Sequence, residues 1–102
     1  MTKEYWTVSE VIEIFQMDED IISYLEEEEI VCPESFDEKP TKRFSVVELD
    51  KLRLVKVLME DMDVNLPGIE VILRMRQNMI QMRRQFDNIL ADIAIELKER
   101  LK

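Results

Sequence analysis

The last third of the sequence most constrains the fold, because nothing in it would end a helix. Pro67 and Gly68 are followed by residues 69–102, which contain no further Pro or Gly. A Pro in the first turn of a helix lacks only a donor that would have no partner there. We therefore expect one helix over residues 66–102. At 1.5 Å per residue it would be a rod of roughly 50 Å.

One face of this expected helix is apolar. Its apolar residues alternate spacings of three and four over about three heptads, which is the a/d pattern of a coiled coil. A rod of this length cannot bury such a seam against its own small domain, so we expect a homodimer. The alternative is a helix that folds back, and parallel or antiparallel pairing stays open. The seam consists of Ile72, Met75, Met79, Met82, Phe86, Ile89 and Ile93.

Two short helices are expected near the N-terminus. The segment Thr7–Glu10 has the residues of a capping box, and apolar residues at helical spacing predict a helix over residues 8–15. Asp18 is a good N-cap for a second helix that runs to about Glu28. Two short helices joined by a tight turn predict a helix-turn-helix.

A small wing and a third helix are expected next. Ile30–Pro33 is predicted to be extended and Arg43–Phe44 to return, which gives a two-stranded wing with a polar tip at residues 37–40. Ser45–Glu48 has the residues of a second capping box, which predicts a helix over residues 46–61. The residues expected to face inward from this helix are Val47, Leu52, Val55, Leu58, Met59 and Met62, with Leu49 at the edge.

These elements predict an all-α fold. A winged helix-turn-helix domain would span residues 1–65, and a dimerisation helix would span 66–102. No run of eighteen apolar residues that could cross a membrane is present. Cys32 is the single cysteine, and the first residues show no signal peptide. Both observations predict a cytoplasmic protein.

The net charge of −9 is unevenly distributed. Residues 1–40 contain thirteen acidic and two basic side chains, a net of −11, whereas residues 41–102 carry a net of +2. Nucleic-acid binders need clustered Lys and Arg for phosphate contacts, so this N-terminal half argues against nucleic acid. It is expected instead to attract a basic protein surface.

Two acidic runs are the candidate partner-binding residues. Each has a simpler explanation, because the first run also caps a helix and the second would also be a solvated helix end. The second run is a poor metal site, because consecutive helical side chains point about 100° apart. The runs are Asp18, Glu19 and Asp20, and Glu26, Glu27, Glu28 and Glu29.

Catalysis is not expected. The chain has no His to act as a base for Cys32, and it has no Gly-rich phosphate loop. Cys32 is therefore expected to be a small buried apolar residue. We expect no cofactor and no metal.

The order of these elements resembles the MerR-like superfamily. The motifs that carry this resemblance are Thr7–Val11, Tyr24–Glu26, Ile30–Pro33, Arg43–Ser45 with Leu49 and Leu52, and Leu66–Ile69. Within that superfamily, Met62–Leu73 is similar to the chaperone-modulator family CbpM, in which a hydrophobic-x-x-Pro-Gly-Ile step also leads into a long C-terminal helix. The resemblance spans nearly the whole chain.

The resemblance to CbpM implies a modulator that binds the J-domain of a DnaJ-like or CbpA-like co-chaperone and inhibits it. J-domains present a basic helix to their chaperone partner, and an acidic protein would cover that helix. The alternative is a MerR-like DNA-binding transcriptional regulator. DNA-binding members place Arg residues in the second helix, whereas the corresponding stretch Asp18–Leu25 contains no basic residue.

Overall fold

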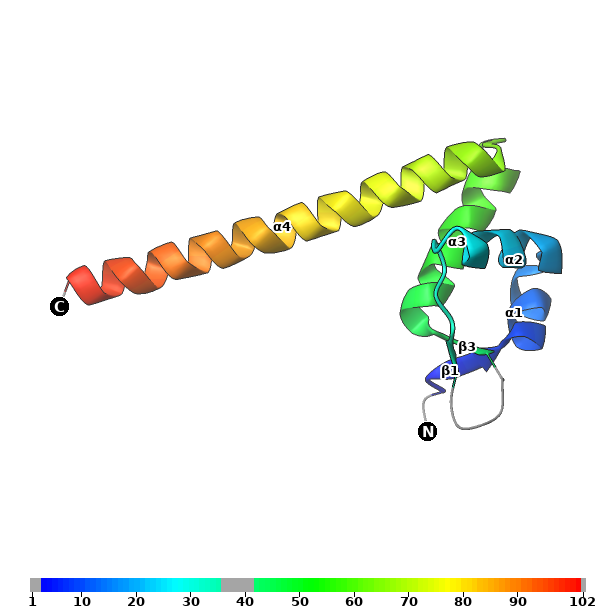
Figure 1. Cartoon of the computed structure of the whole chain (residues 1–102), viewed down its shortest axis with the longest axis horizontal. Coiled ribbons are helices and arrows are strands. Elements are labelled where there is room, and N and C mark those ends of the chain that lie inside the picture. Colours follow the sequence, from blue (N-terminus) through cyan, green and yellow to red (C-terminus); the bar gives the residue numbers. More distant parts are fainter. Residues whose placement is uncertain (1–2, 36–41, 102) are drawn as a thin grey trace.

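The computed structural model describes residues 3–35 and 42–101. A head domain carries five short elements and one longer helix, and a final helix leaves it as a straight rod (Figure 1). The elements are β1 (Tyr5–Thr7), α1 (Val8–Phe15), α2 (Glu19–Glu27), β2 (Glu34–Ser35), β3 (Lys42–Ser45), α3 (Val46–Glu60) and α4 (Leu66–Arg100). The Cα radius of gyration is 18.5 Å, compared with about 13 Å for a compact domain of this size, because the rod extends beyond the head.

The first helix begins as the sequence predicts. The Thr7 hydroxyl accepts a hydrogen bond from the Glu10 amide at 3.3 Å, and the Glu10 carboxylate accepts one from the Thr7 amide at 3.1 Å. This reciprocal pair satisfies two amides that a helix start leaves without partners. α1 ends at Gln16, whose φ of 50° is left-handed and turns the chain toward α2.

The segment after α2 differs from the prediction. Ile30–Pro33 was expected to form a strand of the wing, but it is not part of the sheet. Glu29 has a φ of 58°, and the amides of Ile30 and Val31 then bond to the Leu25 carbonyl at 2.9 and 3.2 Å. These bonds turn Ile30 and Val31 inward, where both are buried.

The fold is mostly helical with a long C-terminal helix, as predicted, but its sheet has three strands, so the prediction of a two-stranded wing is wrong. Its order is β1-β3-β2, and all pairs are antiparallel. Trp6 of β1 faces Phe44 of β3, and Glu34 of β2 faces Arg43. A strand of three residues is too short to show alternation in the sequence. The expected polar tip at residues 37–40 lies outside the described residues.

The core lies between the sheet, α1, α2 and α3, and it is closed by the first two turns of α4. α4 contributes the buried Ile69 and Leu73 to it, and the partly buried Leu66 packs against it. Burying a large aliphatic or aromatic side chain contributes about 1.5–3 kcal/mol, so this cluster stabilises the head. The most deeply buried side chains are Val11, Ile22, Leu25, Val31, Phe44, Leu52, Val55 and Ile69.

α3 is buried along one face only. Leu52, Val55 and Leu58 are buried and Met59 partly so, as expected, whereas Val47 and Met62 are exposed and do not face inward. Val47 lies in the first turn, off the buried stripe, and Met62 lies beyond the last residue of the helix.

The second predicted capping box does not form. Ser45 is the N-cap of α3, but its side chain makes no capping hydrogen bond. The carboxylate of Glu48 instead accepts from the Cys32 amide at 3.0 Å and pairs with Lys51 at 3.2 Å. Glu48 is 8% exposed, and it fastens the segment after α2 to α3.

α4 begins at a tight step. The Asn65 side chain accepts from the Gly68 amide at 2.8 Å and caps the helix. A Cβ at Gly68 would lie 2.9 Å from Val64 Cγ1 and 3.0 Å from Asn65 Oδ1, so only Gly fits without a shift. The long helix therefore starts where the Pro-Gly pair predicts. Of the helices described, none is both long and apolar enough to cross a bilayer.

The unexpected role of Glu48 predicts a stability difference. Glu48→Leu removes the acceptor of the Cys32 amide, which should lower the free energy of unfolding by about 1–3 kcal/mol. Ser45→Ala removes no hydrogen bond of α3 and should change that free energy by less than about 0.5 kcal/mol. Urea unfolding at one fixed protein concentration measures both. A loss for Ser45→Ala equal to that for Glu48→Leu would show that the predicted capping box forms in solution.

Candidate functional site

The two predicted acidic runs lie at opposite ends of α2. Asp18, Glu19 and Asp20 are at its start and residues 26–29 are at its end. A helix of nine residues is about 13 Å long, so the two runs do not form one surface.

The run at the end of α2 is partly neutralised by the protein itself. Glu26 forms an ion pair with Lys42 of β3. Glu28 lies 3.9 Å from Arg74 of α4, whose Nη2 also donates to the Glu28 carbonyl at 2.9 Å. Glu27 and Glu29 are exposed. Two of the four residues of this predicted site, Glu26 and Glu28, therefore have basic partners within the protein.

A small polar network extends this junction between α2 and α4. Arg74 pairs with Glu70 at 3.0 Å, and the Tyr24 hydroxyl donates to the other oxygen of Glu70 at 3.2 Å. Burial, and then the bond to Glu70, raises the pKa of Tyr24 above its ordinary value. The network ties the start of the rod to α2, and so helps to set the direction in which the rod leaves.

The run at the start of α2 faces solvent. Asp18, Glu19 and Asp20 are all exposed, and within the described residues none of them forms an ion pair. Asp18 caps the helix by accepting from the Asp20 amide at 3.1 Å. The simpler explanation from the sequence therefore holds for Asp18, while Glu19 and Asp20 make no such bond.

A hollow of about 230 Å³ lies beside Asp18, between the α1–α2 turn and the second half of α3. Its apolar lining includes Phe15, Ile21 and Met59, and its acidic lining residues are Asp18 and Glu60. Lys56 also lines it, but its ammonium donates to the Phe15 carbonyl. We call this hollow and its neighbours Glu19 and Asp20 the acidic face.

Glu60 is the residue of the acidic face that sequence reasoning missed. It lies 42 residues after Asp18, and the fold alone brings the two together. Asp61 and Asp63 follow it and are exposed, so further negative charge lies next to the hollow. The sequence does show three acidic residues within residues 60–63, but the net charge of +2 over residues 41–102 conceals them.

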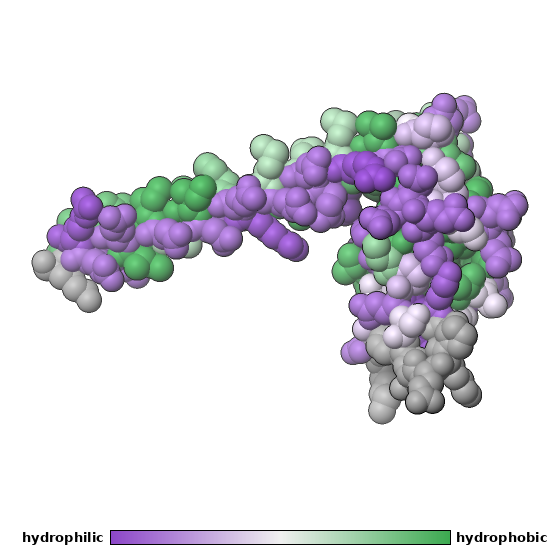
Figure 2. Space-filling view, in the orientation of Figure 1, coloured by the Kyte–Doolittle hydropathy of each residue, from purple (hydrophilic) through white to green (hydrophobic). Residues whose placement is uncertain are grey.

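The head does not cover the seam of α4. All seven seam residues are exposed, from 37% at Ile72 to 67% at Met79 and Met82. Figure 2 shows apolar side chains along the rod well away from the head. The helix therefore does not fold back on its own domain. Leu90 and Leu97, also exposed, widen the apolar stripe.

The described residues hold no group of three or more acidic, Cys or His side chains placed to bind a metal ion. Cys32 was predicted to be buried, but it is exposed. Its Sγ lies 3.8 Å from the Glu29 carbonyl. The turn at Glu29 that buries Ile30 and Val31 leaves the next side chain facing outward.

A family model matches most of the chain. The family described as MerR HTH family regulatory protein matches residues 6–90, from β1 through most of the rod. A comparison with curated proteins found no match. The matched region contains the helix-turn-helix, the sheet and most of the seam. The chain therefore belongs to the MerR helix-turn-helix family of regulatory proteins.

Proposed function

We propose that this chain is a non-enzymatic modulator that binds a basic protein partner through the acidic face. The observation that carries the proposal concerns α2, the second helix of the helix-turn-helix. Its start is acidic and exposed, and its residues Glu19–Glu27 include no basic residue. Carboxylates at that place repel phosphate and attract Lys and Arg. The hollow adds apolar contacts for the aliphatic stems of such side chains.

The partner that we propose is the J-domain of a DnaJ-like or CbpA-like co-chaperone, with inhibition of that co-chaperone as the result. The support is the resemblance of Met62–Leu73 to the CbpM family, together with the basic helix that J-domains present. The step at Leu66–Ile69, which carries that resemblance, is where the rod begins.

We also propose that two copies pair through the seam. Seven exposed apolar residues in an a/d pattern have no cover from the head. Three of them, Met75, Met79 and Met82, give a flexible and polarisable surface. A pair would carry two acidic faces, so it could hold two partner molecules at once.

A second function, sequence-specific DNA binding, is favoured by membership of a helix-turn-helix family of regulators. Fold alone does not decide function. The acidic start of α2 argues against it, and the ion pair of Lys42 with Glu26 offsets one of the few basic side chains of β3.

Charge reversal tests the acidic face. The double variant Asp18→Lys and Glu60→Lys should weaken calorimetric binding to the J-domain by about tenfold, because two attractive contacts become repulsive. The matched control, Asp50→Lys and Asp87→Lys, changes the net charge equally at exposed sites elsewhere and should bind within about twofold of the parent. Equal weakening in both variants would show only general attraction between charges.

A mobility-shift assay with genomic DNA fragments at about 50 mM salt separates the two functions. We expect no sequence-selective complex. Selective binding that persists to about 200 mM salt would overturn the proposal and favour the DNA-binding function.

A single seam substitution tests the pairing. Phe86→Glu should convert the dimer to a monomer in analytical ultracentrifugation, because it places two carboxylates in an apolar interface. Gln81→Glu adds the same charge on an exposed position outside the seam and should leave the dimer intact. A parent protein that sediments as a monomer at tens of micromolar would contradict the proposed pairing.

A further inference from the structure

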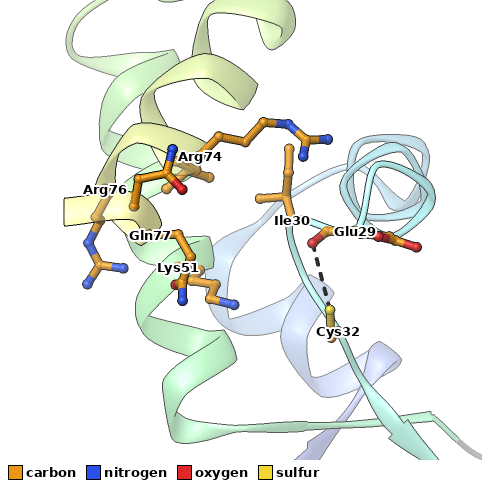
Figure 3. A pocket seen from close by; sticks show the side chains of 9 residues that line it. Glu29, Ile30, Cys32, Lys51, Arg74, Arg76 and Gln77 are labelled. Carbon is orange, nitrogen blue, oxygen red and sulfur yellow. Dashed lines mark hydrogen bonds between the residues drawn. The ribbon is translucent and has the colours of Figure 1, made fainter. Parts of the chain in front are cut away.

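A second cavity lies in the corner where α4 leaves the head. This corner cleft has a volume of about 460 Å³, within the range of about 300–1,000 Å³ that small-molecule sites occupy. Its walls come from three parts of the chain: Ile30 and Cys32 after α2, Lys51 of α3, and Leu73, Arg76 and Gln77 of α4 (Figure 3). It is separate from the acidic face, with which it shares no lining residue.

The charges of the corner cleft are opposite to those of the whole chain. Lys51, Arg74 and Arg76 line it, against the one carboxylate of Glu29. The side chain of Glu29 points toward α2 and away from Arg76 and Lys51 (Figure 3). Lys51 and Arg74 are balanced by ion pairs with Glu48 and Glu70, so Arg76 is the lining cation that has no ion pair among the described residues. The part of α4 that lines the cleft lies within residues 73–78, which contain two Arg and no acidic residue.

These three cations differ in how far the protein already uses them. Arg74 is engaged by Glu70 and by the Glu28 carbonyl. Lys51 makes one bond, to Glu48 at 3.2 Å, and an ammonium has further donors. Arg76 makes no ion pair or side-chain hydrogen bond within the parts of the chain that are described. Arg76, with help from Lys51, is therefore available to a ligand.

The corner cleft also has an apolar part. Ile30 and Leu73, each 6% exposed, contribute buried aliphatic surface. The side-chain amides of Gln77 and Asn78 add neutral donors. Polar groups beside apolar surface are typical of sites for small organic ligands.

We propose that the corner cleft binds a small organic anion. Its carboxylate or phosphate group lies between Arg76 and Lys51, and its apolar part covers Leu73 and Ile30. The planar guanidinium of Arg76 matches two oxygens of such a group at once. The ligand touches α3, α4 and the segment after α2, so it braces the rod against the head. This inference does not depend on the identity of the protein partner.

The test is a titration of the full-length, ¹⁵N-labelled protein with phenyl phosphate, benzoate and inorganic phosphate, followed by amide chemical shifts. Saturable shifts at Lys51, Gln77 and Asn78 are expected with phenyl phosphate or with benzoate, and which of the two binds tighter identifies the preferred acid group. Inorganic phosphate should bind at least several-fold more weakly than phenyl phosphate, because it leaves Leu73 and Ile30 uncovered.

Two variants with the same charge change complete the experiment. Arg76→Gln should weaken the binding of the tighter aromatic anion at least about tenfold, the loss of one charge-assisted hydrogen bond. Arg84→Gln, on an exposed position of α4 outside the cleft, should change it less than about twofold. The proposal is overturned if neither aromatic anion gives saturable shifts at these amides, or if both variants weaken binding equally.

Discussion

The anchoring of α4 through its first two turns is the constraint on which the rest of the structure depends. Ile69 and Leu73 are buried in the head, and Asn65 and Gly68 fix where the helix starts. Arg74, which follows Leu73, donates a hydrogen bond to the Glu28 carbonyl at the end of α2. Beyond these turns the rod has no support from its own domain, and its apolar side is exposed. The same anchoring forms the corner cleft, because it holds α4 beside Lys51 of α3.

Charge divides the molecule into regions with different uses. The start of α2 and the end of α3 are acidic and mostly unpaired, the end of α2 is tied into ion pairs, and the first half of the rod is basic. A chain that binds DNA through its helix-turn-helix needs the reverse order, with cations on the second helix. Under the proposed function, the MerR fold carries an acidic surface that binds a basic protein in place of a phosphate backbone.

Local patterns were predictable, and contacts between distant segments were not. The capping box at Thr7–Glu10 and the start of α4 at Leu66, just before Pro67, depend on residues within one turn, and both are as predicted. Ser45–Glu48 has the same local pattern, but a contact with Cys32, sixteen residues away, takes the Glu48 carboxylate. Pattern alone does not show when a distant donor competes for a side chain.

The candidate site was also predicted only where its residues are neighbours in the sequence. The start of α2 was found because charge and capping are visible in the sequence, whereas Glu60 joins it only through the fold. The second acidic run was predicted as one anionic platform, but Glu26 and Glu28 have partners on β3 and α4 that no local pattern shows. The seam was predicted by its spacing, and the rod leaves it exposed.

Hydrogen–deuterium exchange of the protein, with and without the J-domain co-chaperone, tests whether the acidic face binds that partner. We expect slower exchange at residues 18–22 and 57–61, around the acidic face, with little change at β3. Protection confined to β3, or no protection at either end of the acidic face at saturating partner, would contradict it.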